Sequence, residues 1–147
     1  MMNLERAISI AVEAHKGQID KAGAPYILHP LRVMQSLETV PERIVGILHD
    51  VVEDGPGWTF ERLEEEGFGP EVIEALRLVT KRPEDEGQDI DAYLQFVRRS
   101  LTNPVARRVK AADIRDNLDL TRLREITPKD VARLTKYTVA LRILLDA

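Results

Sequence analysis

The chain has 147 residues, of which 44% are hydrophobic and 31% charged, a composition typical of one folded domain rather than a disordered segment. Its formal net charge of −4 argues against binding of duplex nucleic acid, which needs a basic surface, but leaves room for a small phosphorylated ligand held by a local group of Lys and Arg. The chain has no cysteine, which excludes disulfides, thiolate nucleophiles and Cys-ligated zinc, and no apolar run approaches the roughly 18 residues of a membrane span.

Apolar residues recur at helical spacing along almost the whole chain, and the alternating segments that indicate strands are lacking. We therefore predict an all-α bundle of about eight helices that forms a single domain over residues 1–147. The helices are expected to begin near residues 4, 25, 41, 60, 72, 93, 104 and 128. Pro25 and Pro41 suit first helical turns, and Thr127 with Asp130 predicts a capping box at the start of the last helix.

The third predicted helix carries one imidazole and three carboxylates within six residues, at His49, Asp50, Glu53 and Asp54. On one continuous helix these four side chains share a side, and Gly46 falls within the same arc, where it would leave space. Such a face holds groups that bind a divalent cation or move protons. The alternative is an amphipathic helix with an acidic, solvated face.

Four further polar positions stand out. His15 lies on the buried stripe of the first helix, where a core histidine with a local hydrogen bond is the favoured interpretation. His29 is followed by a proline that restricts the backbone before it and so fixes where the imidazole points. Asp113 and Asn117 are four residues apart and share a helix face, although a solvated charged turn is the alternative there.

Two imidazoles and two carboxylates would surround one ion if these segments met, at His29, His49, Asp50 and Asp113. This mixed nitrogen and oxygen set suits Mn²⁺ or Fe²⁺ and permits Zn²⁺. Such an ion leaves positions for a water and a phosphate oxygen, and can turn the water into a nucleophile. Glu53 and Asp54 lie one turn further on, where they can orient or deprotonate that water.

The order His, then His-Asp, then a distant Asp resembles the HD superfamily of metal-dependent phosphohydrolases. Four segments narrow the resemblance to the hydrolase domain of RelA/SpoT-type alarmone enzymes: residues 14–18, 21–30, 48–54 and 109–117. They occur in the order of that family, and the match runs from about Leu4 to Leu123. Agreement of four segments in order makes the metal-site interpretation much stronger than any one segment does.

The resemblance implies a role for each of these side chains. The implied metal ligands, normally of Mn²⁺, are His29, His49, Asp50 and Asp113. The implied catalytic acidic pair is Glu53 and Asp54, and the implied nucleotide contacts are Lys21 and Asn117. The implied reaction removes the 3′-pyrophosphate from guanosine tetra- or pentaphosphate by attack of a metal-activated water on phosphorus. The synthetase half of the long bifunctional enzymes has no counterpart here, so we expect no pyrophosphokinase activity.

Two positions depart from the family pattern. Asp20 stands where the alarmone hydrolases typically have an Arg that stacks on guanine, and an acid cannot replace it. Leu120 stands where the family typically has a Thr near the nucleotide. Both changes spare the metal site, so hydrolysis of a nucleotide is better supported than hydrolysis of the alarmone in particular. A nucleotide-binding or sensing module without turnover is the alternative, and a structural helical domain without metal is the third.

The expected partner is a small nucleotide or phosphate ester, with no duplex nucleic acid and no membrane, and a homo-oligomer is left open. The N-terminus shows no secretion signal, so we expect a cytoplasmic protein. Five cations either rim a phosphate site or are ordinary surface charges: Lys16, Lys21, Arg32, Lys110 and Arg115. The polar stretch 84–89 is either a lid over the site or a plain loop.

Overall fold

The computed structural model describes residues 3–85 and 89–147, and over these ranges the chain forms nine α-helices and two short 3-10 helices. The α-helices are α1 (Leu4–Ala14), α2 (Leu28–Ser36), α3 (Val40–Leu48), α4 (Val51–Asp54), α5 (Phe60–Glu65), α6 (Pro70–Val79), α7 (Ile90–Arg99), α8 (Pro104–Leu118) and α9 (Pro128–Asp146). The 3-10 helices are η1 (Pro83–Asp85) and η2 (Ser100–Thr102). Within the described ranges the only strand-type pairing is an isolated antiparallel bridge between Ile19 and Pro25. The all-α prediction is confirmed.

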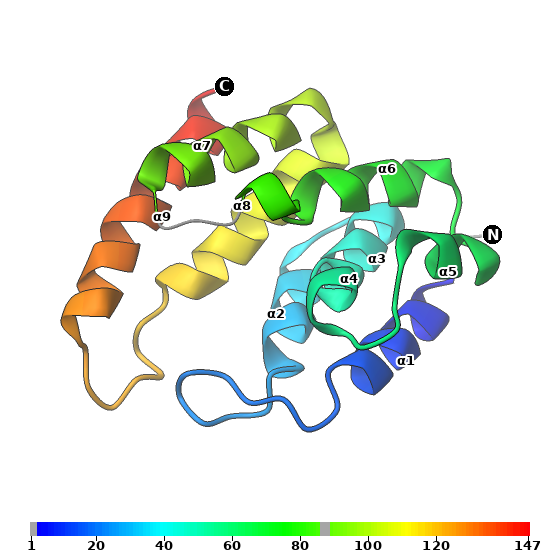
Figure 1. Cartoon of the computed structure of the whole chain (residues 1–147), viewed down its shortest axis with the longest axis horizontal. Helices are drawn as coiled ribbons and strands as arrows, with labels where there is room; N and C mark the ends of the chain where they lie inside the picture. The colour runs from blue at the N-terminus through cyan, green and yellow to red at the C-terminus, as the bar shows by residue number, and fades with distance from the viewer. Residues whose placement is uncertain (1–2, 86–88) are drawn as a thin grey trace.

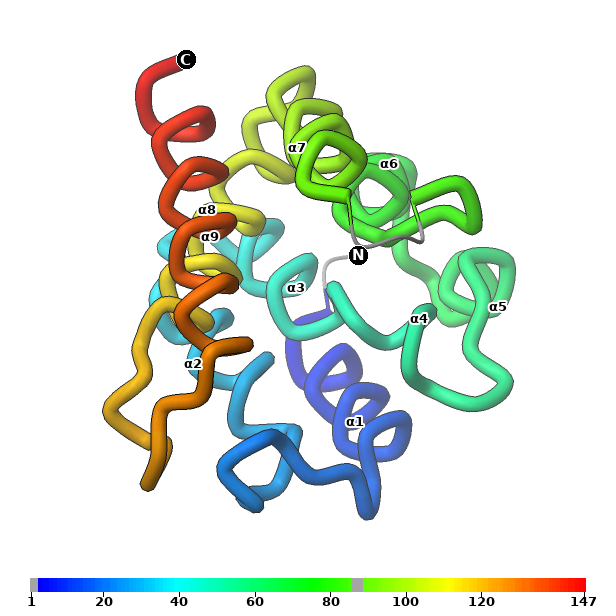
Figure 2. Tube along the Cα trace, turned by 60° about the vertical axis from the view of Figure 1, so that its left-hand side comes forward, coloured from blue at the N-terminus to red at the C-terminus, as the bar shows by residue number. Residues whose placement is uncertain are grey.

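Helix α8 lies at the centre of the arrangement. It contacts α2, α3 and α6 on one side and α9 on the other, and Figures 1 and 2 both show α9 running beside it. Helices α1 to α4 pack together from the first half of the chain, and α7 lies over α9. The centre of the molecule is therefore a helix whose neighbours come from both halves of the sequence.

Two apolar clusters meet at α8. The larger cluster gathers residues of α1 to α6 and takes Ala106, Val109 and Ala112 from α8. The smaller one joins α7 to α9 and takes Ala111 and Ile114 from α8. With about 100° between successive residues of a helix, residues 110, 113 and 117 fall between these two faces. A polar stripe therefore enters the interior between the two clusters.

The second predicted helix begins later than expected. Pro25 does not lie in its first turn, because Pro25 is held in the bridge to Ile19 and α2 starts at Leu28. The loop before it closes on itself through a hydrogen bond from the Asp20 backbone N–H to the Ala24 carbonyl, with N and O 2.8 Å apart. The chain therefore reaches His29 from an ordered turn rather than from within a helix.

The third predicted helix is broken in two. Regular α3 ends at Leu48, and Asp50 adopts φ −107° and ψ 2°, values outside the helical range, before α4 begins at Val51. Gly46 also differs from expectation, because a Cβ there would come within 2.7 Å of the Leu37 side chain. Its small size lets the end of α2 pack closely, and it does not leave open space beside the acidic groups.

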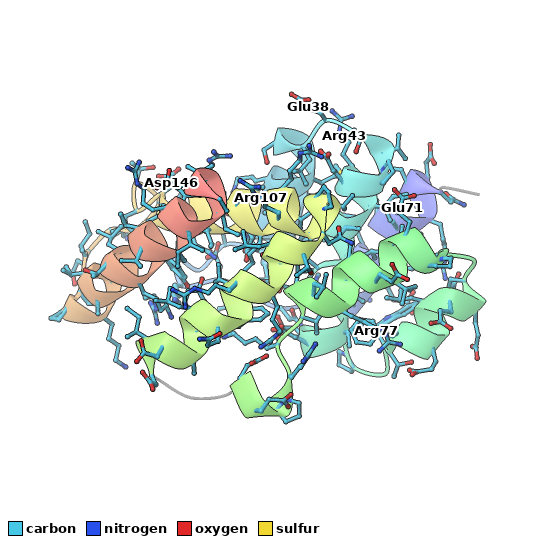
Figure 3. All side chains as sticks on the ribbon, turned by 90° about the horizontal axis from the view of Figure 1, so that it is seen from above. Glu38, Arg43, Glu71, Arg77, Arg107 and Asp146 are labelled. Atoms are coloured by element: carbon cyan, nitrogen blue, oxygen red, sulfur yellow. The ribbon has the colours of Figure 1, made fainter. Side chains whose placement is uncertain are left out.

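The helix ends follow local sequence as predicted. The Asn103 side chain accepts a hydrogen bond from the Ala106 N–H at the start of α8, and Thr127 with Asp130 forms the expected capping box of α9. At the other end of α9, Arg107 donates to the Leu144 carbonyl (2.7 Å) and to the Ala147 carbonyl (2.6 Å). Figure 3 shows Arg107 beside this end of α9. None of the helices in residues 3–85 and 89–147 has the length and apolar character needed to cross a membrane.

Candidate metal centre and active site

Three distant segments bring four donor atoms to one point inside the molecule. Helix α2 supplies His29, the break between α3 and α4 supplies His49 and Asp50, and α8 supplies Asp113 from its polar stripe. The His29 Nε2 atom lies 2.9 Å from Asp113 Oδ1 and 3.8 Å from Asp50 Oδ2. The His49 Nε2 atom lies 3.0 Å from Asp50 Oδ2 and 3.4 Å from Asp113 Oδ1. The four side chains predicted from the sequence therefore meet.

These separations fit a divalent metal ion. Metal–ligand bonds of about 2.1 Å place neighbouring donors of an octahedral site about 3 Å apart. His49 Nε2 is buried and has no hydrogen-bond partner among the described residues, which is costly for a polar atom unless something else binds it. A lone pair on nitrogen beside two carboxylates is a donor set that suits a divalent transition metal.

Both imidazoles are held so that Nε2 faces the cluster. The His49 Nδ1–H donates to the Gly46 carbonyl at 2.6 Å, and because a carbonyl only accepts, Nε2 is the nitrogen left free. His29 Nδ1 lies 2.6 Å from Asp116 Oδ2, and Arg32 in turn holds that carboxylate through Nε (2.7 Å) and Nη2 (3.0 Å). Carboxylate or carbonyl groups behind the ring are the usual support of metal-binding histidines.

The charges of the cluster are strongly coupled. Burial lowers the pKa of His49, but the charges of Asp50 and Asp113 outweigh it, and the pKa lies well above its ordinary value. Burial raises the pKa of Asp113, but Lys110 and His49 outweigh it, and the pKa lies well below its ordinary value. A divalent metal ion binds the neutral imidazole, so metal binding at this cluster competes with protons on His29 and His49.

Two supports of the cluster were not expected from the sequence. The Tyr26 hydroxyl donates to Asp50 Oδ2, and Lys110 Nζ donates to Asp113 Oδ2 at 3.0 Å. Lys110 is buried, yet it also lines the cavity, and its Nζ lies over the Phe96 ring, 4.5 Å from the ring centre. The available signals were spacings of three residues, from Tyr26 to His29 and from Lys110 to Asp113.

Glu53 and Asp54 of α4 both line the cavity, but the two residues are held in different ways. Glu53 Oε1 accepts a hydrogen bond from the Lys81 N–H at 2.6 Å, which fixes this side chain against the residues after α6. Asp54 is oriented through its backbone: Gln18 Nε2 donates to the Asp54 carbonyl at 2.8 Å, while Gln18 Oε1 lies 2.9 Å from His15 Nδ1. Burial raises the pKa of both carboxyls, and the charge of Asp50 raises it further. Asp54 therefore presents the less constrained carboxylate.

His15 is buried, as expected for a core histidine, and its ring lies 5.0 Å from the ring of Tyr26. Its hydrogen bond to Gln18 links α1 to the loop and, through Gln18, to α4. His15 thus belongs to the support of the site and lies apart from the four clustered donors.

A cavity of about 410 Å³ opens over the cluster and is lined by the acidic pair and by cations of several elements. Lys21, Asn117 and Leu120 all line it, as do Arg133 and Lys136 of α9. Asn117 Nδ2 also donates to Asp113 Oδ1, with the two atoms 3.3 Å apart. The cations of α9 were missed in the sequence because they lie beyond the matched segments.

The structure describes only part of the polar stretch 84–89, which was expected to be a lid or a plain loop. Glu84 and Asp85 belong to η1, and residues 86–88 lie outside the described residues.

Asp20, the main departure from the family pattern, turns its carboxylate back into its own loop. Asp20 Oδ1 accepts hydrogen bonds from the Ala22 and Ala24 N–H groups, both at 2.9 Å. The acid therefore shapes the turn that carries Lys21, as Asp commonly does in tight turns.

Comparison with known proteins gives a consistent result. No family model matches the chain. The probable GTP pyrophosphokinase of Mycobacterium leprae is 32% identical over 146 residues, which is 92% of this chain and 18% of that protein. The guanosine-3′,5′-bis(diphosphate) 3′-pyrophosphohydrolase of Aquifex aeolicus is 32% identical over 142 residues, which is 90% of this chain and 20% of that protein. The chain thus spans no more than about a fifth of the length of these curated relatives.

A solved structure of a protein related to SpoT has a similar fold. It is described as a metazoan ortholog of SpoT that hydrolyzes ppGpp, and it superposes with a TM-score of 0.75 at 25% identity, covering 97% of this chain and 91% of that one. The sequence similarity and this superposition both extend over nearly all of the chain. The chain is therefore similar in sequence to a curated guanosine-3′,5′-bis(diphosphate) 3′-pyrophosphohydrolase and in fold to a SpoT ortholog.

Proposed function

We propose that the chain is a divalent-metal-dependent nucleotide phosphohydrolase that removes the 3′-pyrophosphate of guanosine tetra- or pentaphosphate. The observation that supports this most directly is the meeting of two imidazoles and two carboxylates, whose four imidazole–carboxylate separations are 2.9 to 3.8 Å, beside a cavity lined by the acidic pair and by cations. The relatives from Aquifex aeolicus and Spiroplasma citri are both named as 3′-pyrophosphohydrolases of this guanosine nucleotide, which supports the same substrate.

We propose His29, His49, Asp50 and Asp113 as the ligands of the metal, and Mn²⁺ as its identity. Mixed imidazole and carboxylate ligands suit Mn²⁺, and the ion would supply Lewis acidity toward the phosphate and the water. The protein contributes orientation: Asp116 and the Gly46 carbonyl fix the two rings, and Lys110 and Tyr26 fix the two carboxylates.

The acidic pair performs the proton transfer in this proposal. Burial and the neighbouring charge of Asp50 raise the pKa of Asp54, which makes its carboxylate a stronger base. Asp54 takes the proton of the attacking water as the water oxygen bonds to phosphorus and the bond from phosphorus to the ribose 3′ oxygen breaks, and Asp54 then gives this proton to the leaving 3′ oxygen. Glu53, held by the Lys81 N–H, keeps the water in line with phosphorus. Cations on the cavity wall, among them Lys21 and Arg133, neutralise the phosphate oxygens.

Replacement of the base tests the proposal. Asp54→Asn should lower the rate of guanosine tetraphosphate hydrolysis by about 100-fold or more, the usual contribution of a general base. Its thermal midpoint and its bound metal should stay at wild-type values, since Asp54 is not among the four clustered donors. Glu65→Gln is the matched control, because Glu65 is an exposed carboxylate of α5 away from the cavity.

A panel of nucleotides, with and without Mn²⁺, extends the test. Faster release of pyrophosphate from guanosine tetraphosphate than from other 3′-phosphorylated nucleotides is the expected outcome. If protein that holds its metal hydrolyses none of these nucleotides, the proposed enzymatic function is refuted. In that case a nucleotide that binds tightly and stays intact would favour the sensing module instead.

A further inference from the structure

One wall of the cavity is formed by α7 and α9, which pack against each other. Tyr93 of α7 lines this wall, and only 8% of the residue is exposed. Its hydroxyl is buried and has no hydrogen-bond partner among the described residues. A buried hydroxyl without a partner costs free energy in the folded protein, so an unpartnered hydroxyl on a residue that lines a cavity points to a ligand that accepts its hydrogen.

Lys136 of α9 lies against the same tyrosine, with Nζ 4.5 Å from the centre of the Tyr93 ring. Burial lowers the pKa of Lys136, and positive charges around it lower it further, those of Lys81, Arg133, Lys21 and Lys110. Cations gathered in this way repel one another, and an anion between them removes that repulsion. The wall therefore offers a hydrogen-bond donor and positive charge to the same ligand.

The position of Tyr93 relative to the four clustered donors indicates which kind of ligand the wall binds. The Tyr93 ring lies 6.3 Å from the Phe96 ring, and Lys110 Nζ lies 4.5 Å from the centre of that same Phe96 ring while it donates to Asp113 of the ligand cluster. Tyr93 therefore lines the part of the cavity that is near the cluster. A single phosphate held at the cluster would leave this donor unused. A diphosphate whose proximal phosphate lies at the cluster carries its second phosphate outward, into the same cavity that Tyr93 and Lys136 line.

We propose that Tyr93 and Lys136 form a binding site for the distal phosphate of the 3′-diphosphate group. The proximal phosphate, whose phosphorus is attacked, stays at the metal cluster. The inference rests on the proposed function for the identity of the nucleotide, but the binding site itself requires only a diphosphate. Inorganic pyrophosphate, which carries both phosphates without the nucleoside, is therefore a sufficient probe.

Calorimetric titration of metal-loaded protein tests the site. Tyr93→Phe and Lys136→Gln should each weaken the binding of inorganic pyrophosphate by about 10-fold or more, as expected for a hydrogen bond to a charged group. Binding of orthophosphate should change by less than about threefold, because it occupies the cluster alone. Lys129→Gln is the control, since Lys129 is an exposed cation of α9 that does not line the cavity.

Two further measurements separate binding from folding. Tyr93→Phe should keep or slightly raise the thermal midpoint, because the lost hydroxyl has no partner to lose. Elemental analysis after titration should show that the protein still holds its metal, which excludes extraction of the metal by pyrophosphate as the cause.

Pyrophosphate affinities of Tyr93→Phe and Lys136→Gln within twofold of wild type would overturn the site. Equal losses of pyrophosphate and orthophosphate binding would overturn it as well, as would wild-type protein that binds no pyrophosphate. These outcomes are distinct from failure of the proposed function. Protein that binds pyrophosphate through Tyr93 but hydrolyses no guanosine nucleotide would support this binding site and refute the proposed substrate. Protein that hydrolyses guanosine tetraphosphate but binds pyrophosphate equally well with and without the Tyr93→Phe change would support the substrate and refute the binding site.

Discussion

His29 and His49 present the same ring nitrogen to the cluster because the other nitrogen of each ring is already engaged. A backbone carbonyl holds His49 and the Asp116 carboxylate holds His29. The contact between Asp116 and His29 is the easier one to test, because a side chain can be replaced by mutation and a backbone carbonyl cannot. Arg32 donates two hydrogen bonds to Asp116, so the carboxylate that orients His29 is itself held in place.

Asp116→Asn should lower the affinity for Mn²⁺ by about 10- to 100-fold, the usual effect of removing the group behind a metal-binding histidine. The amide keeps the shape of the carboxylate but loses the charge that orients His29 and attracts Arg32. Chelator competition measures the affinity. Asp119→Asn, an exposed acid at the end of the same helix, should bind metal as wild type does, and a similar affinity for both variants would contradict this role of Asp116.

The break between α3 and α4 shows how one element positions two kinds of group. The His49 ring bonds the Gly46 carbonyl, which in a continuous helix accepts from the backbone of residue 50. The turn at Asp50 then sends α4 in a new direction, so that His49 and Asp50, two of the proposed metal ligands, lie at the break and the acidic pair follows in α4. Close packing at Gly55 holds α4 against α1, because a Cβ there would lie 2.5 Å from the Val51 carbonyl oxygen and 2.7 Å from the Ala14 Cβ.

Gly55→Ala should therefore destabilise the fold by about 1–3 kcal/mol, the usual cost of overpacking. Because the clash displaces α4, the hydrolysis rate should fall even at temperatures where the variant is fully folded. Denaturant unfolding and steady-state rates measure the two effects. Gly69→Ala is the comparison, since a Cβ at Gly69 meets no atom within 4 Å, and equal stabilities of the two variants would refute the close packing.

The capping box of α9 predicts a pH dependence. The Thr127 backbone N–H and hydroxyl hold the pKa of Asp130 below its ordinary value. The carboxylate therefore stabilises the fold above its unfolded pKa of about 3.9, and this contribution is lost as the pH falls through the lower folded pKa. Asp130→Asn should lower the thermal midpoint at pH 7, and the difference from wild type should shrink toward pH 3. A difference that stays constant with pH would contradict the assignment.

At the scale of the whole molecule, α8 joins two apolar clusters and carries the polar stripe between them. The smaller cluster is what holds α9, with its cavity-lining cations, against the rest of the protein. Leu144 is 1% exposed within that cluster, whereas its neighbour Leu145 is 47% exposed. Attachment of the cationic wall therefore depends on a few buried side chains of α9.

Leu144→Ala should cost about 2–5 kcal/mol in the free energy of unfolding, since it removes a fully buried side chain and leaves a cavity. Leu145→Ala, next along the same helix, should cost less than about 0.5 kcal/mol. Urea unfolding of both variants gives the comparison directly. Similar costs at the two positions would show that α9 is not attached through this cluster.

The sequence predicts the helices well where caps and prolines agree with apolar spacing, as at Asn103 and Thr127. It does not predict the break at Asp50, because apolar residues continue at helical spacing across it. The ligand set was predicted by family resemblance, and the structure brings its members together. The support by Asp116 was not predicted, because its meaning depends on where a distant helix places His29.

Metal removal and reloading tests the central claim most directly. Protein stripped by a chelator should release no pyrophosphate from guanosine tetraphosphate, and reloading with Mn²⁺ should restore release of one pyrophosphate per nucleotide. His49→Gln, which loses a donor of the cluster, should neither retain Mn²⁺ nor hydrolyse the nucleotide. Undiminished hydrolysis by the stripped protein or by His49→Gln would contradict the account, as would wild-type protein that holds Mn²⁺ and leaves the nucleotide intact.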